Sequence, residues 1–466
     1  MVRVAINGYG RIGRVAHRVM LQWHTDEMEV VAINVGHSTD LKGWMYLLKY
    51  DSVYGLLPFE ISIKPNANED DKTFLGHLIV GGKEIPVYSQ KDPNLLPWKD
   101  LNVDVVIEAT GAFTSKDKAG QHVTAGAKAV VLSAPGKEGE MPTYVISVNE
   151  GDYKGETVIS NASCTTNCIT PVAKVIEEQF GIQKAMMTTV HGYTSDQELQ
   201  DGGHKDYRRA RAAGLNIIPT STGATIAAAE ALPALKGIFA GLSIRVPVPV
   251  GSLSDFTFLL KKDVTVEDVN NALKEASEKP EYKGILAVSE DPLVSSDIIG
   301  NSHSSIADLS LTQVVGGNML KVIAWYDNEY GYANRLVEET VMVGEKLAHS
   351  TNSGPSASEQ PVPEHTASDV QPAPVSEPTS TPAPVRSDSE VPPAPIAYSS
   401  AETPSWKMPP NPVTVQAEES AQASIVSELA QAAQNLEHPA EAASAENSGE
   451  PKEDESSSGV KPAPVE

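Results

Sequence analysis

A group of small polar residues around two cysteines carries the clearest chemical signal in this sequence. The chain has two cysteines, and both lie in residues 163–168, which read Ser-Cys-Thr-Thr-Asn-Cys. With His191 downstream, Cys164 has the residue types that an activated sulfur nucleophile needs, and the neighbouring hydroxyls suit a bound oxyanion or phosphate. The alternative is a buried helix start in which cysteine acts as a small hydrophobic residue. Cys168 lies one helical turn past Cys164, and we assign it a packing role.

A glycine-rich run near the start of the chain predicts a dinucleotide site. Residues 7–14 read Asn-Gly-Tyr-Gly-Arg-Ile-Gly-Arg, directly after a strand pattern and at the start of a helical one. In this context the first glycine allows a tight turn, the second lets the backbone approach a pyrophosphate, and the third lets the helix pack on the strand. The helix N-terminus then faces the anion. The alternative is a glycine-rich turn that binds nothing. The cofactor-binding residues expected from this run are Gly8, Gly10, Arg11, Ile12 and Gly13.

The end of the second predicted strand bears on the choice between NAD and NADP. An acidic residue there normally binds the adenosine ribose hydroxyls of NAD. Here Asn34 is followed by Val35, and no carboxylate occurs before Asp40. This permits NADP, because no acid would repel a 2′-phosphate, and polar residues 37–39 and Lys42 lie nearby. The alternative is that Asp40 folds back to bind the ribose.

Strand and helix patterns predict two folded domains. Apolar runs alternate with helical patterns over residues 1–162, which predicts an α/β fold with a Rossmann-type, doubly wound parallel sheet for dinucleotide binding, completed by the helix 329–348. Residues 163–328 show a different pattern, which predicts an α+β catalytic domain with a large mixed sheet. The helices expected are 11–23, 169–180, 266–278 and 335–347, and the strands expected are 2–6, 30–34, 103–108, 129–133, 242–247, 255–261, 308–313 and 319–326.

Overall composition excludes several classes of function. The chain of 466 residues has a formal net charge of −25 and should repel nucleic acid and anionic membranes, because both bind basic surfaces. No apolar run reaches the length of about 18 residues that a membrane span needs, and the first residues lack a signal-peptide pattern. Two cysteines so close in sequence form no disulfide framework, so we expect a cytoplasmic protein. No Cys/His pairs have zinc-ligand spacing, and we expect no metal.

Residues 350–466 differ in composition from the rest of the chain. They hold 18 Asp and Glu residues, 4 Lys and Arg residues and 19 of the 33 prolines, which gives a net charge of −14. Such a segment cannot bury enough apolar surface to offset the entropy of ordering, so we predict a disordered acidic tail. Residues 415–437 have apolar residues at helical spacing. Two hypotheses remain for them: a helix that forms on an unidentified protein partner, or a transient solvated helix.

Seven specific runs occur in one order along residues 1 to about 347. They are Asn-Gly-Tyr-Gly-Arg-Ile-Gly-Arg at 7–14, Leu-Leu-Lys-Tyr-Asp-Ser at 47–52, Ser-Cys-Thr-Thr-Asn-Cys at 163–168, His-Lys-Asp-Tyr-Arg-Arg-Ala-Arg at 204–211, Pro-Thr-Ser-Thr-Gly-Ala at 219–224, Arg-Val-Pro-Val-Pro at 245–249 and Trp-Tyr-Asp-Asn-Glu-Tyr-Gly-Tyr at 325–332. In these runs the chain resembles the type I family of phosphorylating glyceraldehyde-3-phosphate dehydrogenases. The tail lies outside the resemblance.

The resemblance implies oxidation of D-glyceraldehyde 3-phosphate to 1,3-bisphosphoglycerate with NAD or NADP, in glycolysis or gluconeogenesis. Cys164 would add to the aldehyde to give a hemithioacetal, hydride transfer would leave a thioester, and inorganic phosphate would release the product. His191 would act as the base, and a helix N-terminus and an adjacent imidazolium would favour the thiolate. Two alternatives stay open: a relative that acts on erythrose 4-phosphate, and a scaffold or binding role carried by the tail.

Family positions also suggest which residues hold the two phosphates and the cofactor. Thr194 and Arg245, with Arg209 shared or nearby, match the positions that bind the substrate phosphate. The positions for inorganic phosphate match Ser163, Thr165, Thr222 and Gly223, and the positions that line the cofactor match Thr110, Ser133 and Asn328, the last of which orients the nicotinamide carboxamide.

Two departures from the family pattern bear on the cofactor. Family members usually have Asp where this chain has Val35, and NAD-specific members have Leu-Pro where it has Gly202 and Gly203. Both changes remove features that exclude NADP, and Lys91 falls where a basic residue often lies near the adenosine. We therefore predict dual or NADP-leaning use. The resemblance also implies a homotetramer, with residues 196–214 as the loop between subunits.

Overall fold

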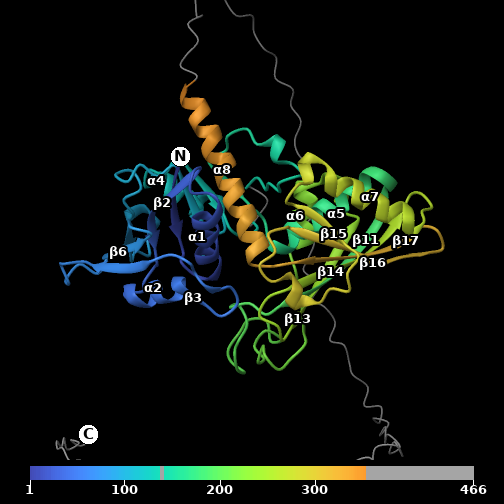
Figure 1. The fold of residues 1–466 in the computed structure, drawn as a ribbon, viewed down its shortest axis with the longest axis horizontal. Helices are drawn as coiled ribbons and strands as arrows, with labels where there is room; N and C mark the ends of the chain where they lie inside the picture. Colours follow the sequence, from blue (N-terminus) through green and yellow to red (C-terminus); the bar gives the residue numbers. More distant parts are fainter. Residues whose placement is uncertain (137–140, 353–466) are drawn as a thin grey trace, which may run out of the picture. The chain divides into compact units, whose positions relative to one another are not determined.

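The computed structural model describes residues 1–136 and 141–352, which form two large β-sheets flanked by helices (Figure 1). The predictions of a disordered tail and of a helix over 415–437 lie outside the described residues. Within the described part, none of the helices combines the length and the apolar character that crossing a bilayer requires.

The first sheet has eight strands in the order β10-β9-β8-β1-β2-β7-β6-β5. All neighbours from β10 to β7 pair in parallel, with β1 at the point where the chain changes direction along the sheet, so the prediction of a Rossmann-type α/β fold is confirmed. The β7-β6-β5 edge is antiparallel, which the sequence did not predict. Gly81 and Gly82, both with positive φ, make the tight turn between β6 and β7. The strands are β1 Val2–Asn7, β2 Met28–Asn34, β5 Ile61–Pro65, β6 Phe74–Val80, β7 Lys83–Tyr88, β8 Val105–Glu108, β9 Ala129–Leu132 and β10 Val158–Ser160.

Helices cover the first sheet, and the last of them comes from the far end of the described chain. α8 leaves the second sheet and packs against α1, β1, β8 and β9 (Figure 1). It begins at Tyr330, within one residue of the predicted helix 329–348 and before the apolar pattern at 335–347. The start is set by the Asp327 carboxylate, which accepts the backbone N–H groups of Glu329 and Tyr330 at 2.9 and 2.7 Å. Besides its eight strands, this part of the structure contains α1 Arg11–Trp23, α2 Leu41–Lys49, the hairpin β3 Tyr50–Asp51 and β4 Gly55–Leu56, α3 Lys116–Ala119, α4 Gln121–Thr124 and α8 Tyr330–Asn352, with short 3₁₀ turns at Pro93–Leu95 and Glu150–Asp152.

The second sheet has seven strands in the order β12-β13-β11-β14-β17-β16-β15. The pairs β11–β13 and β15–β16 are parallel and the other pairs are antiparallel, so the predicted large mixed sheet is confirmed. Its elements are α5 Cys164–Phe180, β11 Ile182–Gly192, β12 Ile218–Thr220, α6 Ala224–Ala231, β13 Phe239–Val246, β14 Ser252–Leu260, α7 Val266–Glu278, β15 Leu286–Ser289, β16 Ser305–Val315 and β17 Met319–Tyr326, with 3₁₀ turns at Pro233–Leu235, Pro280–Tyr282 and Ser295–Ile298.

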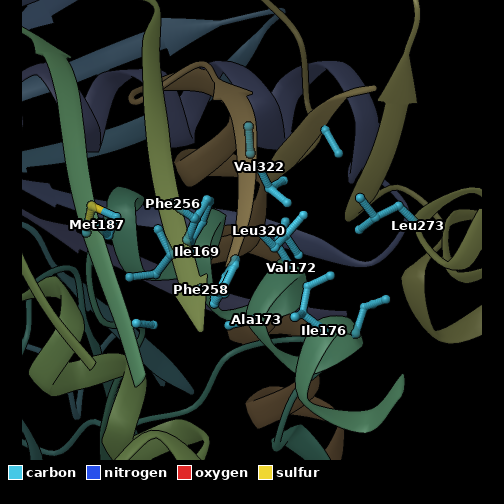
Figure 2. Close-up of a cluster of buried hydrophobic side chains, with 14 of the residues drawn as sticks. Ile169, Val172, Ala173, Ile176, Met187, Phe256, Phe258, Leu273, Leu320 and Val322 are labelled. Atoms are coloured by element: carbon cyan, nitrogen blue, oxygen red, sulfur yellow. The ribbon is translucent and has the colours of Figure 1, made fainter. Parts of the chain in front are cut away.

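The main core of the second sheet lies beneath α5. Ile169, Val172 and Ile176 recur at helical spacing on one face of α5, and all three are fully buried against the sheet (Figure 2). Phe256 and Phe258 of β14 stack with ring centroids 5.3 Å apart. Truncating either phenylalanine to alanine would cost roughly 3–5 kcal/mol. This packing fixes α5 on the sheet and therefore fixes whatever its first turn carries.

Candidate active site

Cys164 is the first residue of α5. The sequence pattern predicted a helix only from residue 169, because threonine and asparagine are weak helix formers. The helix begins earlier because Ser163 caps it, with its Oγ accepting the backbone N–H of Thr166 at 3.1 Å. Cys164 therefore stands at the positive end of a helix dipole, which favours a negative charge on its sulfur.

His191 faces Cys164 from the end of β11. Its Nε2 lies 3.4 Å from the Cys164 Sγ, and its Nδ1 lies 2.6 Å from the carbonyl oxygen of Gly192. Because a carbonyl only accepts hydrogen bonds, we assign the ring proton to Nδ1, which leaves the Nε2 lone pair facing the sulfur. The structure thus brings the predicted nucleophile and the predicted base together.

Arg245 is the nearest cation to this pair. It lies opposite His191 in the pairing of β11 with β13. Its Nη1 is 3.1 Å from His191 Nδ1, and it donates to the Gly192 carbonyl oxygen and to Thr194 Oγ1, both at 3.3 Å. Arg245 and Thr194, the two residues predicted for the substrate phosphate, are therefore in contact beside the base, where a guanidinium and a hydroxyl suit a phosphate.

The protonation states of Cys164 and His191 follow from burial and from Arg245. Burial raises the pKa of the Cys164 thiol, and the Arg245 charge and hydrogen bonds from Thr165 oppose that rise. Burial and the Arg245 charge lower the pKa of His191 to about 3. Both shifts favour the uncharged forms, a thiol beside a neutral imidazole. A second cation beside Arg245 is unfavourable here, so these effects act against the imidazolium that the sequence led us to expect, and that expectation stays a prediction.

The two hydroxyls that flank Cys164 have different partners. Ser163 Oγ lies 2.8 Å from Thr166 Oγ1 at the partly exposed start of the helix. Thr165 is buried, and its Oγ1 lies 2.9 Å from the hydroxyl of Tyr326. The Thr165 hydroxyl therefore has a partner inside the protein, and Thr165 also hydrogen-bonds to the Cys164 sulfur through its side chain and its backbone N–H.

Thr222 and Gly223 lie at the start of α6, beside the start of α5. Gly223 is the N-cap of α6, and Thr222 Oγ1 accepts the backbone N–H of Ala224 at 3.2 Å. The Thr166 hydroxyl of α5 donates to the Ala224 carbonyl oxygen at 3.4 Å, which holds the two helix starts together. Two adjacent helix N-termini concentrate positive partial charge, and this arrangement suits inorganic phosphate.

Arg209, predicted as shared between the two phosphates, is engaged by the protein. Its Nε donates to Thr220 Oγ1 at 2.9 Å, its Nη2 donates to the Ser221 carbonyl oxygen at 3.2 Å, and it forms an ion pair with Asp196. These bonds fix the segment that leads into Thr222. The structure therefore gives Arg209 a clear part in shaping this loop.

The glycine-rich turn between β1 and α1 fits a bound pyrophosphate. A Cβ atom on Gly8, whose φ is +94°, would lie 2.7 Å from the Thr110 backbone nitrogen, and a Cβ on Gly13 would lie 2.1 Å from the Gly8 carbonyl oxygen. A Cβ on Gly10 would meet nothing within 4 Å, so the turn is open there. Gly10 is the N-cap of α1 and has no side chain to accept the first N–H groups of the helix, which therefore remain for an anion.

Arg11 and Ile12, the first two residues of α1, were both predicted to bind the cofactor. The Arg11 side chain is held by ion pairs with Asp51, at 2.5 Å, and with Glu329. The Ile12 side chain packs against the core that α8 covers. Both side chains are thus committed within the protein, and both residues can serve an anion through their backbone N–H groups.

Asn34 joins the end of β2 to the segment that carries Lys91. Its Nδ2 donates to Asn7 Oδ1 at 2.6 Å and to the Gln90 carbonyl oxygen at 2.8 Å, and its Oδ1 accepts the Gln90 backbone N–H at 2.9 Å. The exposed Lys91 follows directly after Gln90. The structure therefore holds the residues predicted to lie near the adenosine at one edge of the sheet.

The side chains after Asn34 leave this edge without a free carboxylate. Val35 is buried, and Asp40 caps α2 by accepting the Gly43 backbone N–H at 2.7 Å. That bond disfavours the alternative in which Asp40 binds the ribose. Gly202 and Gly203, the second departure from the family pattern, are exposed.

Thr110, Ser133 and Asn328 follow the ends of three different strands. Thr110 comes after β8, and its backbone N–H donates to the Glu108 carboxylate at 2.8 Å. The Ser133 backbone N–H, after β9, donates to the Glu108 carbonyl oxygen at 2.9 Å. The carboxyl ends of neighbouring parallel strands point the same way, so these two residues lie at the same end of the strands as Gly8. Asn328 follows β17 and is buried.

Sequence reasoning missed Tyr326, the last residue of β17. Its hydroxyl lies 2.9 Å from Thr165 Oγ1 and 2.8 Å from Thr189 Oγ1, and its ring meets the His191 ring edge-on at a centroid distance of 6.0 Å. Tyr326 therefore ties the first turn of α5 to the strand that carries the base. Its position in the run 325–332 was visible in the sequence, but its contacts depend on how three strands pair.

The fold and the site define a class: an α/β protein with a Rossmann-type dinucleotide turn and a cysteine–histidine pair, of which the histidine is buried and the cysteine partly exposed. Two family models match the chain, that of the glyceraldehyde 3-phosphate dehydrogenase NAD binding domain over residues 2–116 and that of the C-terminal domain over residues 163–328. The chain belongs to the glyceraldehyde 3-phosphate dehydrogenase family. It is therefore an oxidoreductase that uses a nicotinamide cofactor.

Relatives support this assignment along the described part of the chain. A glyceraldehyde-3-phosphate dehydrogenase of Mycobacterium avium is 49% identical over 351 residues, and one of Geobacillus stearothermophilus is 50% identical over 347 residues. Each alignment covers 74% of this chain and 99% of the relative. The chloroplastic enzyme A of Chlamydomonas reinhardtii is 48% identical over 349 residues, 74% of this chain and 89% of the relative.

Proposed function

We propose that this chain catalyses the phosphorylating oxidation of D-glyceraldehyde 3-phosphate to 1,3-bisphosphoglycerate with NAD or NADP. The observation that carries the proposal is the Cys164–His191 pair, with Sγ and Nε2 3.4 Å apart at the N-terminus of α5 and Arg245 beside it. Relatives that share about half of its residues bear the name of this dehydrogenase. Erythrose 4-phosphate as the substrate, or the tail as the sole functional part, is not favoured.

The first step joins Cys164 to the substrate. Its Sγ bonds to the aldehyde carbon while the thiol proton passes to Nε2 of His191, whose lone pair faces the sulfur. The carbonyl oxygen takes up that proton, and a hemithioacetal results. The Cys164 backbone N–H, at the start of α5, stabilises the negative charge that develops on this oxygen.

The second step is the oxidation. Nε2 of His191 removes the hydroxyl proton of the hemithioacetal as a hydride leaves the same carbon, and a thioester remains on Cys164. A nicotinamide dinucleotide, bound at the turn formed by Gly8, Gly10 and Gly13, supplies the acceptor for that hydride. The low pKa of His191 keeps its Nε2 unprotonated until it accepts a proton from the thiol or from the hemithioacetal hydroxyl.

The third step releases the product to phosphate. An oxygen of inorganic phosphate bonds to the acyl carbon, the carbon–sulfur bond breaks, and the sulfur recovers its proton from His191. We propose that the attacking phosphate binds where α5 and α6 begin, at Ser163, Thr165, Thr222 and Gly223. Arg245 and Thr194 hold the substrate phosphate, and Arg209 supports both sites from the segment between β11 and β12.

We also propose that the chain accepts NADP as well as NAD. Three observations support this proposal. Val35 is buried, Asp40 caps α2, and Lys91 directly follows Gln90, whose backbone is hydrogen-bonded to the Asn34 side chain. An acid near a 2′-phosphate would repel it, whereas a lysine attracts it. Comparable values of kcat/KM with NAD and NADP would support this proposal. A preference for NAD above about a hundredfold would contradict it.

The predicted domains and assembly extend the proposal. Residues 1–162 with the helix 329–348 would bind the dinucleotide, and residues 163–328 would carry the catalysis. Four large apolar side chains of the loop region, Leu199, Tyr207, Leu215 and Ile217, are each at least 70% exposed. Exposed apolar side chains grouped in one region are typical of a contact face, which is compatible with the predicted homotetramer. Light scattering of the purified chain would give four times the chain mass.

Absorbance at 340 nm tests the reaction directly. The wild-type chain should reduce NAD or NADP only when glyceraldehyde 3-phosphate and inorganic phosphate are both present. Cys164→Ser should lower kcat by roughly 10⁴-fold or more, because the nucleophile and the base act as one unit. Cys168→Ser, one helical turn further along α5, is the matched control and should keep its activity. Activity that persists in Cys164→Ser would refute the mechanism.

A further inference from the structure

Ser252, the first residue of β14, contacts both the residue after His191 and Asn328. Its side chain is buried, and its Oγ makes two hydrogen bonds to groups that are far apart in the sequence. It accepts the backbone N–H of Gly192 at 3.2 Å and lies 2.8 Å from Asn328 Oδ1. None of the steps described above uses this hydroxyl.

The single hydroxyl proton of Ser252 has one destination. The Gly192 N–H can only donate, so it occupies a lone pair of Oγ, and the hydroxyl proton is left for Asn328 Oδ1. Asn328 Oδ1 also accepts the backbone N–H of Gly251 at 3.2 Å. If the Asn328 amide were turned over, its own NH₂ would face the Gly251 N–H, donor against donor. The amide orientation is therefore set, with Nδ2 directed away from Ser252.

The other bond of Ser252 acts on the base. Gly192 donates its N–H to Ser252 and accepts the His191 Nδ1 proton on its carbonyl oxygen at 2.6 Å. Gly192 has little room to move, since a Cβ there would lie 3.0 Å from the Val248 carbonyl oxygen. The backbone unit that fixes the His191 tautomer is thus itself fixed by the Ser252 hydroxyl.

We propose that Ser252 is a positioning residue. Its one hydroxyl helps to fix both the orientation of the proton acceptor, His191, and the orientation of the Asn328 amide that orients the nicotinamide. This inference rests on the proposed function, because it takes the role of Asn328 from it. Loss of the hydroxyl leaves the Gly192 N–H without this acceptor and removes the shorter of the two hydrogen bonds that hold Asn328 Oδ1. The loss should therefore change both the affinity for the cofactor and the reactivity of the Cys164 thiol.

Ser252→Ala tests the proposal with two measurements that need no turnover. Calorimetric titration of the full-length protein with NAD should show affinity weaker by about tenfold, as expected for one lost buried hydrogen bond to the amide that orients the nicotinamide. The rate at which iodoacetamide alkylates Cys164 in the absence of cofactor should fall severalfold, because Nε2 is no longer held toward Sγ. In turnover, kcat should fall along with the rise in KM for the cofactor.

Two further variants separate positioning from simple packing. Ser252→Thr keeps the hydroxyl and should restore most of both losses. Ser254→Ala removes an equally buried hydroxyl two positions along the same strand and should leave both measurements at the wild-type value. In an Asn328→Ala background, Ser252→Ala should no longer weaken NAD binding, because the two residues act on the same contact.

The measurements separate the positioning role of Ser252 from the proposed dehydrogenase activity. If Ser252→Ala matches Ser254→Ala in NAD affinity and in alkylation rate, the positioning role is overturned while the dehydrogenase proposal stands. A Ser252→Thr variant as impaired as Ser252→Ala also overturns it, because the hydroxyl would then not be the cause. If the wild-type chain binds neither NAD nor NADP, the proposed function fails, and this inference fails with it.

Discussion

The two helices that begin at the proposed ligand sites, α1 and α5, start in opposite ways. α1 has Gly10 at its N-cap, with no side chain to accept an N–H and nothing close to a Cβ built there. α5 has Ser163 at its N-cap, and the serine oxygen binds the Thr166 N–H. A bare helix start leaves its N–H groups for a large anion. A capped start uses one N–H to fix the first turn, and the side chain presented there, Cys164, is held in place.

Among the variants that test this comparison, Gly10→Ala should have the largest effect, on cofactor binding at α1. The added methyl fills the open side of the turn, where we place the pyrophosphate, so the affinity for NAD measured by calorimetry should fall by about 100-fold. The thermal unfolding temperature should stay close to that of wild type, since nothing in the protein lies within 4 Å. Gly151→Ala, equally free of neighbours and remote from the turn, is the control. Undiminished NAD affinity in Gly10→Ala would show that the bare helix start is not the cofactor site.

Arg245→Gln should have the next largest effect, on the α5 side. Loss of charge-assisted bonds to the substrate phosphate should raise KM for glyceraldehyde 3-phosphate by roughly 10–100-fold. The pKa of Cys164 should rise further, because the Arg245 charge lowers it in the wild type. The pH profile of Cys164 alkylation, measured with iodoacetamide, should therefore move to higher pH.

The pH profile of Cys164 alkylation in the wild type tests the protonation states on which the Arg245→Gln prediction depends. Because burial raises the pKa of Cys164 and the pKa of His191 lies at about 3, alkylation should increase through the alkaline range, with no inflection near pH 6.5. An inflection near pH 6.5 would mean that His191 is protonated in the resting enzyme, as the sequence first suggested.

Ser163→Ala should have a moderate effect that is specific to the capped helix. Loss of the cap should cost about 1 kcal/mol of unfolding free energy and slow Cys164 alkylation severalfold, because the first turn of α5 loosens. Thr265→Ala removes the N-cap of α7, where the Thr265 hydroxyl accepts the Asp268 N–H at 3.1 Å. It should lose similar stability in denaturant titrations and alkylate at the wild-type rate. Equal alkylation rates in the two variants would remove the link between the cap and the nucleophile.

Glu339→Gln should have the smallest effect, on stability alone. Glu339 of α8 is fully buried and binds the Asn161 amide at 2.5 Å in the segment before α5, and burial raises its pKa well above the usual range. Folding therefore favours its protonated form. The wild type should lose stability as pH rises from the ordinary carboxyl pKa toward this raised value, and the glutamine variant should not lose it. Thermal unfolding between pH 5 and 9, with the exposed Glu345→Gln as control, checks the difference.

Sequence alone predicted those parts of the site whose chemistry demands particular residues at fixed spacing. The glycines of the first turn are required by close backbone approaches, and the start and end of α1 were predicted as observed. The pattern around Cys164 indicated a nucleophile because few other roles need a cysteine among hydroxyls beside a histidine. These features are local, or depend only on residue type.

Features that depend on distant contacts could not be predicted. The early start of α5 depends on a cap and on burial that outweigh weak helix propensity. The inward turn of the Thr165 hydroxyl depends on Tyr326, which reaches it from another strand. The Arg11 side chain is held by Asp51 and Glu329, which only the folded chain brings together. The protonation of His191 depends on a cation placed opposite it by strand pairing.

The packing of α8 on the first sheet has a consequence for how the protein is made. Strands β1, β8 and β9 leave the ribosome long before Tyr330–Asn352, yet α8 covers part of their apolar face, including Val4, Val105 and Val131. That face stays uncovered until the second sheet and its helices have been synthesised, so the first half of the chain waits for the last described helix to complete its core. A chain that stops before Tyr330 would keep this surface exposed and would tend to aggregate.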